Sequence, residues 1–89
     1  MSDLNIVIRV MPNGDEFDVE VPDFSTGKDL IEGLLQKQVA PRNDASGNPF
    51  VYELISKAKN VKIGETKTLL DVGITDGDTL YFTPKLVAG

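Results

Sequence analysis

The sequence contains no cysteine and no histidine. It therefore offers no thiolate nucleophile, no imidazole base and no soft metal ligand, which excludes most catalytic and zinc-binding arrangements. Without cysteine there is also no disulfide framework, so stability has to come from packing and hydrogen bonds. From these absences we expect a protein that is not an enzyme and that holds no metal or cofactor.

Positive charge and long apolar runs are also scarce. The 14 acidic residues outnumber the 9 basic ones and give a net charge of −5, whereas nucleic-acid binding requires a clustered basic face. No apolar run approaches the roughly 20 residues of a membrane span, and the acidic start Met1-Ser2-Asp3 is unlike an export signal. We therefore expect a cytoplasmic protein whose partners are neither nucleic acids nor membranes.

The length of 89 residues is enough for one domain with a modest core. The first part of the chain has the pattern of a β-hairpin. Apolar and polar residues alternate from Leu4 to Val10 and again from Glu16 to Val21, as in half-buried strands. Between them Asn13-Gly14 favours a tight turn, because both residue types tolerate positive φ. The alternate acidic residues of the second strand are interpreted as a solvated outer face rather than a metal site.

A helix is predicted directly after the hairpin. Ser25 or Thr26 offers a hydroxyl N-cap, and Asp29 stands three residues after Thr26, as in a capping box. Apolar residues then recur at helical spacing and form one stripe, at Leu30, Ile31, Leu34 and Leu35. Gly33 weakens the helix interior by roughly 1 kcal/mol, and the sequence leaves open whether it also permits a close approach to the sheet.

The remainder of the chain reads as a loop followed by short elements. The polar stretch from Ala40 to Pro49 predicts a surface loop in which Arg42 and Asp44 are solvated charges, so no site is placed there. The patterns further on predict strands at 50–55, 61–63 and 79–83, a capped helical turn at 68–71 and a tight turn at 75–78. Pro84 has no N–H and is expected to end the pairing, which gives a domain at 1–84 and a flexible tail at 85–89.

This order of hairpin, helix, strands, short turn and strand is typical of the β-grasp architecture, an α+β fold with one sheet and one crossing helix. The stretch from Val61 to Leu80 resembles ubiquitin without a gap, most specifically at Thr68-Leu69, Asp71, Ile74 and Thr79-Leu80. The segment 75–80 is also similar to bacterial ubiquitin-like proteins. These include a secretion-associated group and proteins encoded beside activating enzymes, conjugating enzymes and zinc isopeptidases.

The register of the ubiquitin resemblance continues through the tail. It places Gly89 on the terminal glycine of ubiquitin, whose carboxylate no Cβ obstructs. Lys85 and Leu86 align with tail residues, which implies that an activating enzyme recognises them. Ala88 departs from the pattern, because ubiquitin has glycine there, so a dedicated activating enzyme would be required. Thr83 replaces a tail-proximal apolar residue, and we expect receptors of ubiquitin itself to bind poorly.

Two functions of different classes follow from the resemblance. In the first, the chain is a protein modifier: an adenylating enzyme activates the Gly89 carboxylate, a conjugating enzyme transfers it to amines of target proteins, and a zinc isopeptidase removes it. In the second, the chain is a noncovalent module of a secretion or defence assembly, binds through the open face of its sheet, and has an incidental tail. A sulfur carrier is a third alternative that Ala88 weakens. The matching tail length favours the modifier.

Overall fold

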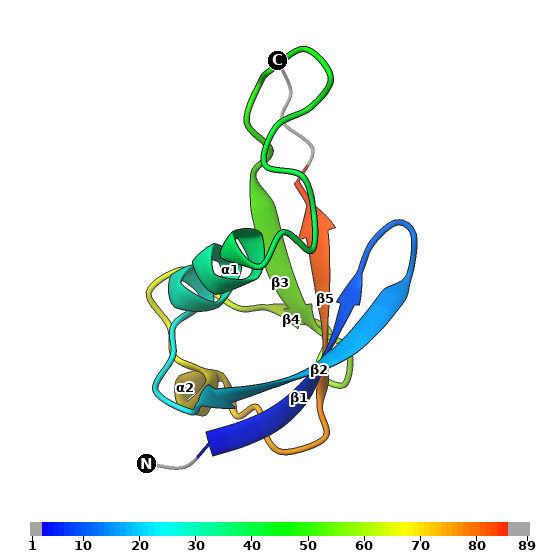
Figure 1. Cartoon of the computed structure of the whole chain (residues 1–89). Coiled ribbons are helices and arrows are strands. Elements are labelled where there is room, and N and C mark those ends of the chain that lie inside the picture. The colour runs from blue at the N-terminus through cyan, green and yellow to red at the C-terminus, as the bar shows by residue number, and fades with distance from the viewer. Residues whose placement is uncertain (1–2, 86–89) are drawn as a thin grey trace.

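A computed structural model describes residues 3–85. They form one five-stranded sheet in the order β2-β1-β5-β3-β4, crossed on one face by a helix (Figure 1). The elements in chain order are β1 (Asp3–Val10), β2 (Asp15–Pro22), α1 (Gly27–Gln36), β3 (Tyr52–Ser56), β4 (Val61–Lys62), α2 (Leu69–Val72) and β5 (Thr79–Pro84). β1 and β5 run parallel, and the other neighbours are antiparallel. This is the predicted α+β β-grasp architecture, with the last strand at the centre of the sheet.

The core lies between the sheet and α1. Alternate residues of β1 point into it, and the predicted helical stripe meets them through Leu30, Leu34 and Leu35, with Ile31 only partly buried. The remaining buried apolar residues come from later elements: Tyr52, Leu54, Ile63, Leu69, Ile74, Leu80 and Phe82. Burial of such side chains provides the main driving force for folding. Within the part of the chain that the structure describes, no element covers the other face of the sheet (Figure 1).

Both helices begin with the same cap. The Thr26 hydroxyl accepts from the Asp29 amide at 3.1 Å, and the Asp29 carboxylate accepts from the Thr26 amide at 3.3 Å, which confirms the predicted capping box. Thr68 and Asp71 repeat the arrangement at 3.0 and 3.1 Å. Hydrogen bonds from Thr68 lower the pKa of the Asp71 carboxyl. The two cap residues also pair with each other in an antiparallel β-bridge, which joins the starts of the helices.

The two glycines of α1 have opposite surroundings. A Cβ on Gly27 would lie 2.6 Å from the Gly64 carbonyl oxygen and 3.0 Å from that of Ile63, so the backbones approach each other at this point. A Cβ on Gly33 would have no neighbour within 4 Å. The question that the sequence left open at Gly33 is thereby answered: no close approach requires a glycine there.

The hairpin turn between β1 and β2 differs from its prediction. Four residues, 11–14, separate the paired Val10 and Asp15, and of these only Gly14 has a positive φ, at 83°. The Asn13 side chain instead donates to the Asp15 carboxylate at 2.7 Å, so the turn is not the two-residue kind that Asn-Gly favours.

Pro84 also does not end the pairing, because the Lys85 amide donates to the Val51 carbonyl at 2.6 Å. Backbone groups of successive strand residues point to opposite neighbours, so residues two apart point to the same one. The Phe82 carbonyl, two residues before Pro84, accepts from Met11 on the β1 side. The missing N–H of Pro84 therefore faces that side and removes no bond to β3.

The loop after α1 projects beyond the sheet (Figure 1) and has more structure than expected. Asp44 is not merely solvated: its Oδ1 accepts from the amides of Ser46 and Asn48 at 2.9 and 3.0 Å, which is an Asx-type turn. The Tyr52 hydroxyl donates to the Pro41 carbonyl at 2.7 Å and ties the loop to the core. Burial raises the pKa of Tyr52.

Within residues 3–85, no helix is long and apolar enough to cross a membrane. The same part of the chain brings together no group of three or more acidic side chains that could hold a metal ion. The acidic residues of β2 are exposed and follow its length, in agreement with their interpretation as a solvated face.

Candidate functional site

The open face of the sheet carries one row of side chains that crosses all five strands. Arg9 pairs with Glu16 on β2 and with Tyr81 on β5, Ile55 on β3 pairs with Tyr81, and Lys62 on β4 pairs with Ile55. The residues on either side of Arg9, Ile55 and Tyr81 are buried, so these three side chains point away from α1. Glu16 and Lys62 share their face because they are paired with Arg9 and Ile55. We call these five residues the cross-sheet row. It places an aromatic and an aliphatic side chain between charged ends.

The centre of the row is apolar and partly exposed. Tyr81 and Ile55 are neighbours on the central strands, and Val7, which is paired with Thr79 on β5, lies on the same face. A phenol ring supplies a large, rigid contact area together with a hydroxyl that forms hydrogen bonds, and such residues are enriched where proteins bind one another. The centre of the row is therefore suited to contact with a partner protein.

Ion pairs stand at both ends of the row. Arg9 lies 3.9 Å from the Glu16 carboxylate, and Lys62 lies 3.4 Å from the carboxylate of Glu53. Three of these side chains are about 40 to 50% exposed, and only Glu53 is mostly covered. Exposed pairs of this kind contribute about 0 to 1 kcal/mol to stability. Their charges are thus available to a partner at little cost to the fold.

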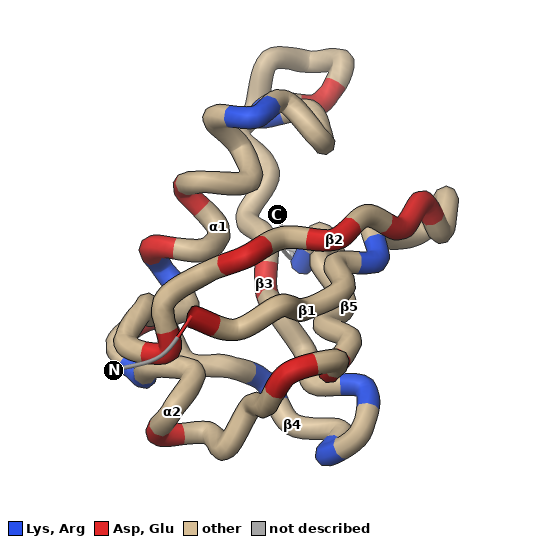
Figure 2. Tube along the Cα trace, turned by 60° about the horizontal axis from the view of Figure 1, so that its bottom comes forward, with Lys and Arg blue, Asp and Glu red and all other residues tan. Residues whose placement is uncertain are grey.

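The two edges of the sheet carry mostly opposite charges (Figure 2). Acidic residues follow β2, whereas Lys57, Lys59 and Lys62 gather around β4 and the turn that precedes it. A partner that approaches the open face therefore meets negative charge on one side of Tyr81 and positive charge on the other. Charge patterns of this kind orient protein partners more than they strengthen binding.

Of the tail residues predicted from the ubiquitin resemblance, the structure describes Lys85. Gly89, Leu86 and Ala88 lie outside the described residues. Lys85 is exposed, and its amide donates to the carbonyl of Val51, the residue before β3, as described above. The predicted tail therefore does not separate from the sheet at residue 85.

The resemblance to ubiquitin does not assign the residues of the open face, because it leaves the register of the strand predicted at 50–55 ambiguous. The structure pairs Leu54 with Phe82 and Ile55 with Tyr81. The signal was present in the alternation of Tyr52, Leu54 and Ser56, all buried, with Glu53 and Ile55. It was obscured because Ser56, a polar residue, occupies an inward position. Thr83 lies opposite Glu53, so this end of the face is polar.

Solved structures similar to this chain include ubiquitin and ubiquitin-like proteins. Ubiquitin of Caldiarchaeum subterraneum is 21% identical, with a TM-score of 0.68, and the match covers 99% of this chain and all of that one. A ubiquitin-like domain of an Arabidopsis thaliana protein is 14% identical, with a TM-score of 0.72 over 100% of this chain and 84% of the other. A protein designed de novo on the basis of ubiquitin is 25% identical, with a TM-score of 0.72 over 98% and 95%.

These likenesses establish a ubiquitin-like β-grasp fold. No curated protein matches the chain. A protein-family model described as "WXG100 protein secretion system (Wss), protein YukD" matches residues 5–82, which include both helices and all or most of every strand. The chain therefore belongs to the YukD family.

Proposed function

We propose that this protein is a noncovalent, ubiquitin-like interaction module of a WXG100 protein secretion system. The observation that carries the proposal is the family match over residues 5–82, which names that secretion system. It favours the second of the two functions inferred from the sequence over the first. The role is one of binding rather than catalysis, and the partner is a protein component of the secretion system.

The docking surface in this proposal is the open face of the sheet, centred on Tyr81 and Ile55. Support comes from its partly exposed apolar centre and from the exposed ion pairs at its ends, whose side chains can form new pairs with a partner. Binding energy usually concentrates in a few central aromatic or Arg side chains, whose truncation costs about 2 kcal/mol or more. We therefore expect Tyr81→Ala to weaken binding by roughly 30-fold or more, and a substitution at the rim, Lys62→Ala, to have a smaller effect that depends on salt.

Site-specific photo-crosslinking tests the surface directly. The chain is expressed together with the secretion system, with p-benzoylphenylalanine in place of Tyr81 or, as a matched control, in place of Gln36, which is exposed on α1. The proposal expects a covalent adduct with a component of the secretion system from position 81 and not from position 36. Equal adducts from both positions, or none from position 81, would contradict it.

Conjugation through Gly89 is the competing function and makes a different prediction. In that case Lys85, Leu86 and Ala88 are recognised by the activating enzyme, and the partners are that enzyme, a conjugating enzyme, a zinc isopeptidase and target proteins. Since the Lys85 amide is bonded to the Val51 carbonyl, an enzyme that takes up the tail from residue 85 has to break this bond.

Intact-protein and peptide mass spectrometry separates the two functions. The full chain and a chain without Gly89 are each expressed with the candidate enzymes encoded nearby. The noncovalent proposal expects no Gly89-to-amine linkage, and the crosslink from position 81 persists without Gly89. An isopeptide bond found only with the full chain would instead establish the modifier.

A further inference from the structure

The edge of the sheet at β2 presents free main-chain hydrogen-bonding groups. Within residues 3–85, β2 pairs with β1 alone. On β1, the Val7 amide and the Asn5 carbonyl bond to residues 78 and 77, on the β5 side. Because backbone groups alternate along a strand, Ile6 and Ile8 use theirs on β2, where their partners are Val19 and Phe17.

The amides and carbonyls of Glu16, Asp18 and Glu20 therefore point outward from the sheet. Neither their amides nor their carbonyls bond to any other described segment. Pro22 closes this edge, because it has no N–H and its carbonyl accepts from Ser25 at 3.1 Å. The outward groups thus form a defined stretch of edge, open to a strand from another molecule.

A groove of about 140 Å³ runs beside this edge, between β2 and α1. Its apolar lining comes from Val19 and Val21 on the strand and from Leu30 and Leu34 on the helix. Gly33 also lines the groove, and a Cβ there would meet nothing within 4 Å. The missing side chain at Gly33 leaves room above the floor of the groove.

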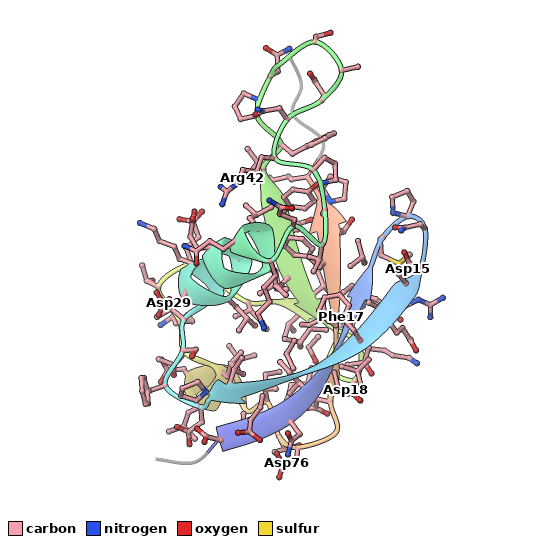
Figure 3. All side chains as sticks on the ribbon, in the orientation of Figure 1. Asp15, Phe17, Asp18, Asp29, Arg42 and Asp76 are labelled. Carbon is pink, nitrogen blue, oxygen red and sulfur yellow. The ribbon has the colours of Figure 1, made fainter. Side chains whose placement is uncertain are left out.

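The two sides of the β2 edge differ in character. Phe17 packs toward the core and Asp18 is exposed, with the same alternation along the strand (Figure 3). A strand added beside β2 would thus place one set of side chains over the apolar groove. The other set would lie next to Glu16, Asp18 and Glu20, where opposite charges are favoured across strands.

From this alternation we infer that the β2 edge is a second binding site, distinct from the open face, for an extended peptide segment of alternating basic and apolar residues. The segment adds a sixth strand to the sheet. Main-chain hydrogen bonds to Glu16, Asp18 and Glu20 hold it, its apolar side chains cover the groove, and its Lys or Arg side chains face the three carboxylates. Strand addition of this kind is a common mode of peptide recognition.

The test uses the full chain and a peptide built to this pattern, acetyl-Lys-Val-Lys-Val-Lys-Val-Lys-amide. Binding is followed by ¹⁵N NMR titration, and hydrogen exchange of the chain's amides is measured with and without the peptide. We expect the outward amides of Glu16, Asp18 and Glu20 to become protected when the peptide is bound. A peptide with Glu in place of each Lys serves as the control and is expected not to bind.

Two variants separate the groove from the charges. Gly33→Leu fills the groove and, as a change from glycine to a good helix former, leaves α1 intact, so we expect at least tenfold weaker binding. Asp18→Lys reverses one cross-strand charge, and we expect about fivefold weaker binding. Gln36→Leu is the matched control for added apolar surface on α1, because Gln36 does not line the groove; we expect it to bind as the natural chain does.

Three outcomes would overturn the inference. The first is no binding of the Lys-Val peptide. The second is binding that neither protects the amides of Glu16, Asp18 and Glu20 nor responds to Gly33→Leu, because that pattern indicates only diffuse attraction to acidic side chains. The third is protection of these amides in the chain without peptide that increases with its concentration, because a second copy of the chain would then occupy the edge.

Discussion

Gly27→Ala tests whether the close contact at the start of α1 determines stability. The new Cβ would lie 2.6 Å from the Gly64 carbonyl oxygen, so α1 and the segment 63–67 would have to separate. Two hydrogen bonds join them at this point, from Gly27 to the Lys67 carbonyl at 3.1 Å and from Lys28 to the Glu65 carbonyl at 3.2 Å. Each contributes about 1 kcal/mol, and overpacking of this kind typically costs about 1 to 3 kcal/mol.

We therefore expect Gly27→Ala to lower the free energy of unfolding by about 2 kcal/mol, after the better helix propensity of alanine is taken into account. For a domain of this size, that corresponds to a fall in Tm of about 8 to 16 °C. Thermal and urea unfolding followed by far-UV circular dichroism measure both quantities. Gly33→Ala is the matched control in the same helix, where the Cβ meets nothing, and we expect it to stabilise the chain by about 0.5 to 1 kcal/mol.

The difference in stability between Gly27→Ala and Gly33→Ala shows whether the backbone contact at Gly27 determines stability. If Gly27→Ala were as stable as the natural chain, the backbone contact with Gly64 would not restrict that position and the reasoning would be wrong. If both variants lost the same stability, the loss would come from a general effect of alanine in α1 and not from the contact.

Three further predictions concern caps and titrating groups. Thr68→Ala removes the cap of α2 and is expected to cost about 1 kcal/mol in urea unfolding, whereas no loss would mean that the cap is dispensable. The pKa of Asp71 is lowered in the folded state, so its contribution is present above the ordinary carboxyl pKa and is lost as pH falls through the lowered value. Asp71→Asn should flatten that part of the stability profile, and an unchanged profile would contradict the assignment. Tyr52→Phe removes the bond to Pro41 and should cost about 1 kcal/mol. Because the pKa of Tyr52 is raised, the natural chain alone should show a stability contribution that is complete below pH 10 and is lost as pH rises through the raised pKa. Equal alkaline profiles of the two chains would refute this.

The elements with local signals were predictable from the sequence. Strict alternation located β1 and β2, and the Thr26-to-Asp29 and Thr68-to-Asp71 spacings located both helix starts, because a capping box needs only residues that are close in sequence. The β-grasp order followed from these elements. The resemblance to ubiquitin at residues 61–80 supported the same order.

Features that depend on long-range pairing were not predictable. The pairing of β5 with β1 and β3 determines which neighbouring strand Pro84 faces with its nitrogen, and no local sequence pattern reveals it. The cross-sheet row joins residues from β1 to β5 and required the register of β3. The structural role of Asp44 was likewise missed, because the same polar loop sequence is compatible with an Asx turn and with a solvated aspartate. The need for glycine at position 27, in contrast to 33, arises from a segment more than 30 residues away.

The position of β5 between β1 and β3 has a consequence for how the chain is made. The ribosome synthesises β1, β2, α1 and β3 before β5, the strand that joins them in the sheet. Until then the hairpin and β3 have no shared neighbour, and the sheet that the apolar stripe of α1 covers lacks its central strand. We therefore expect the domain to fold in one cooperative step, and only after β5 has been made. A nascent chain halted before Thr79 would be an open, protease-sensitive intermediate and not a smaller version of the native protein.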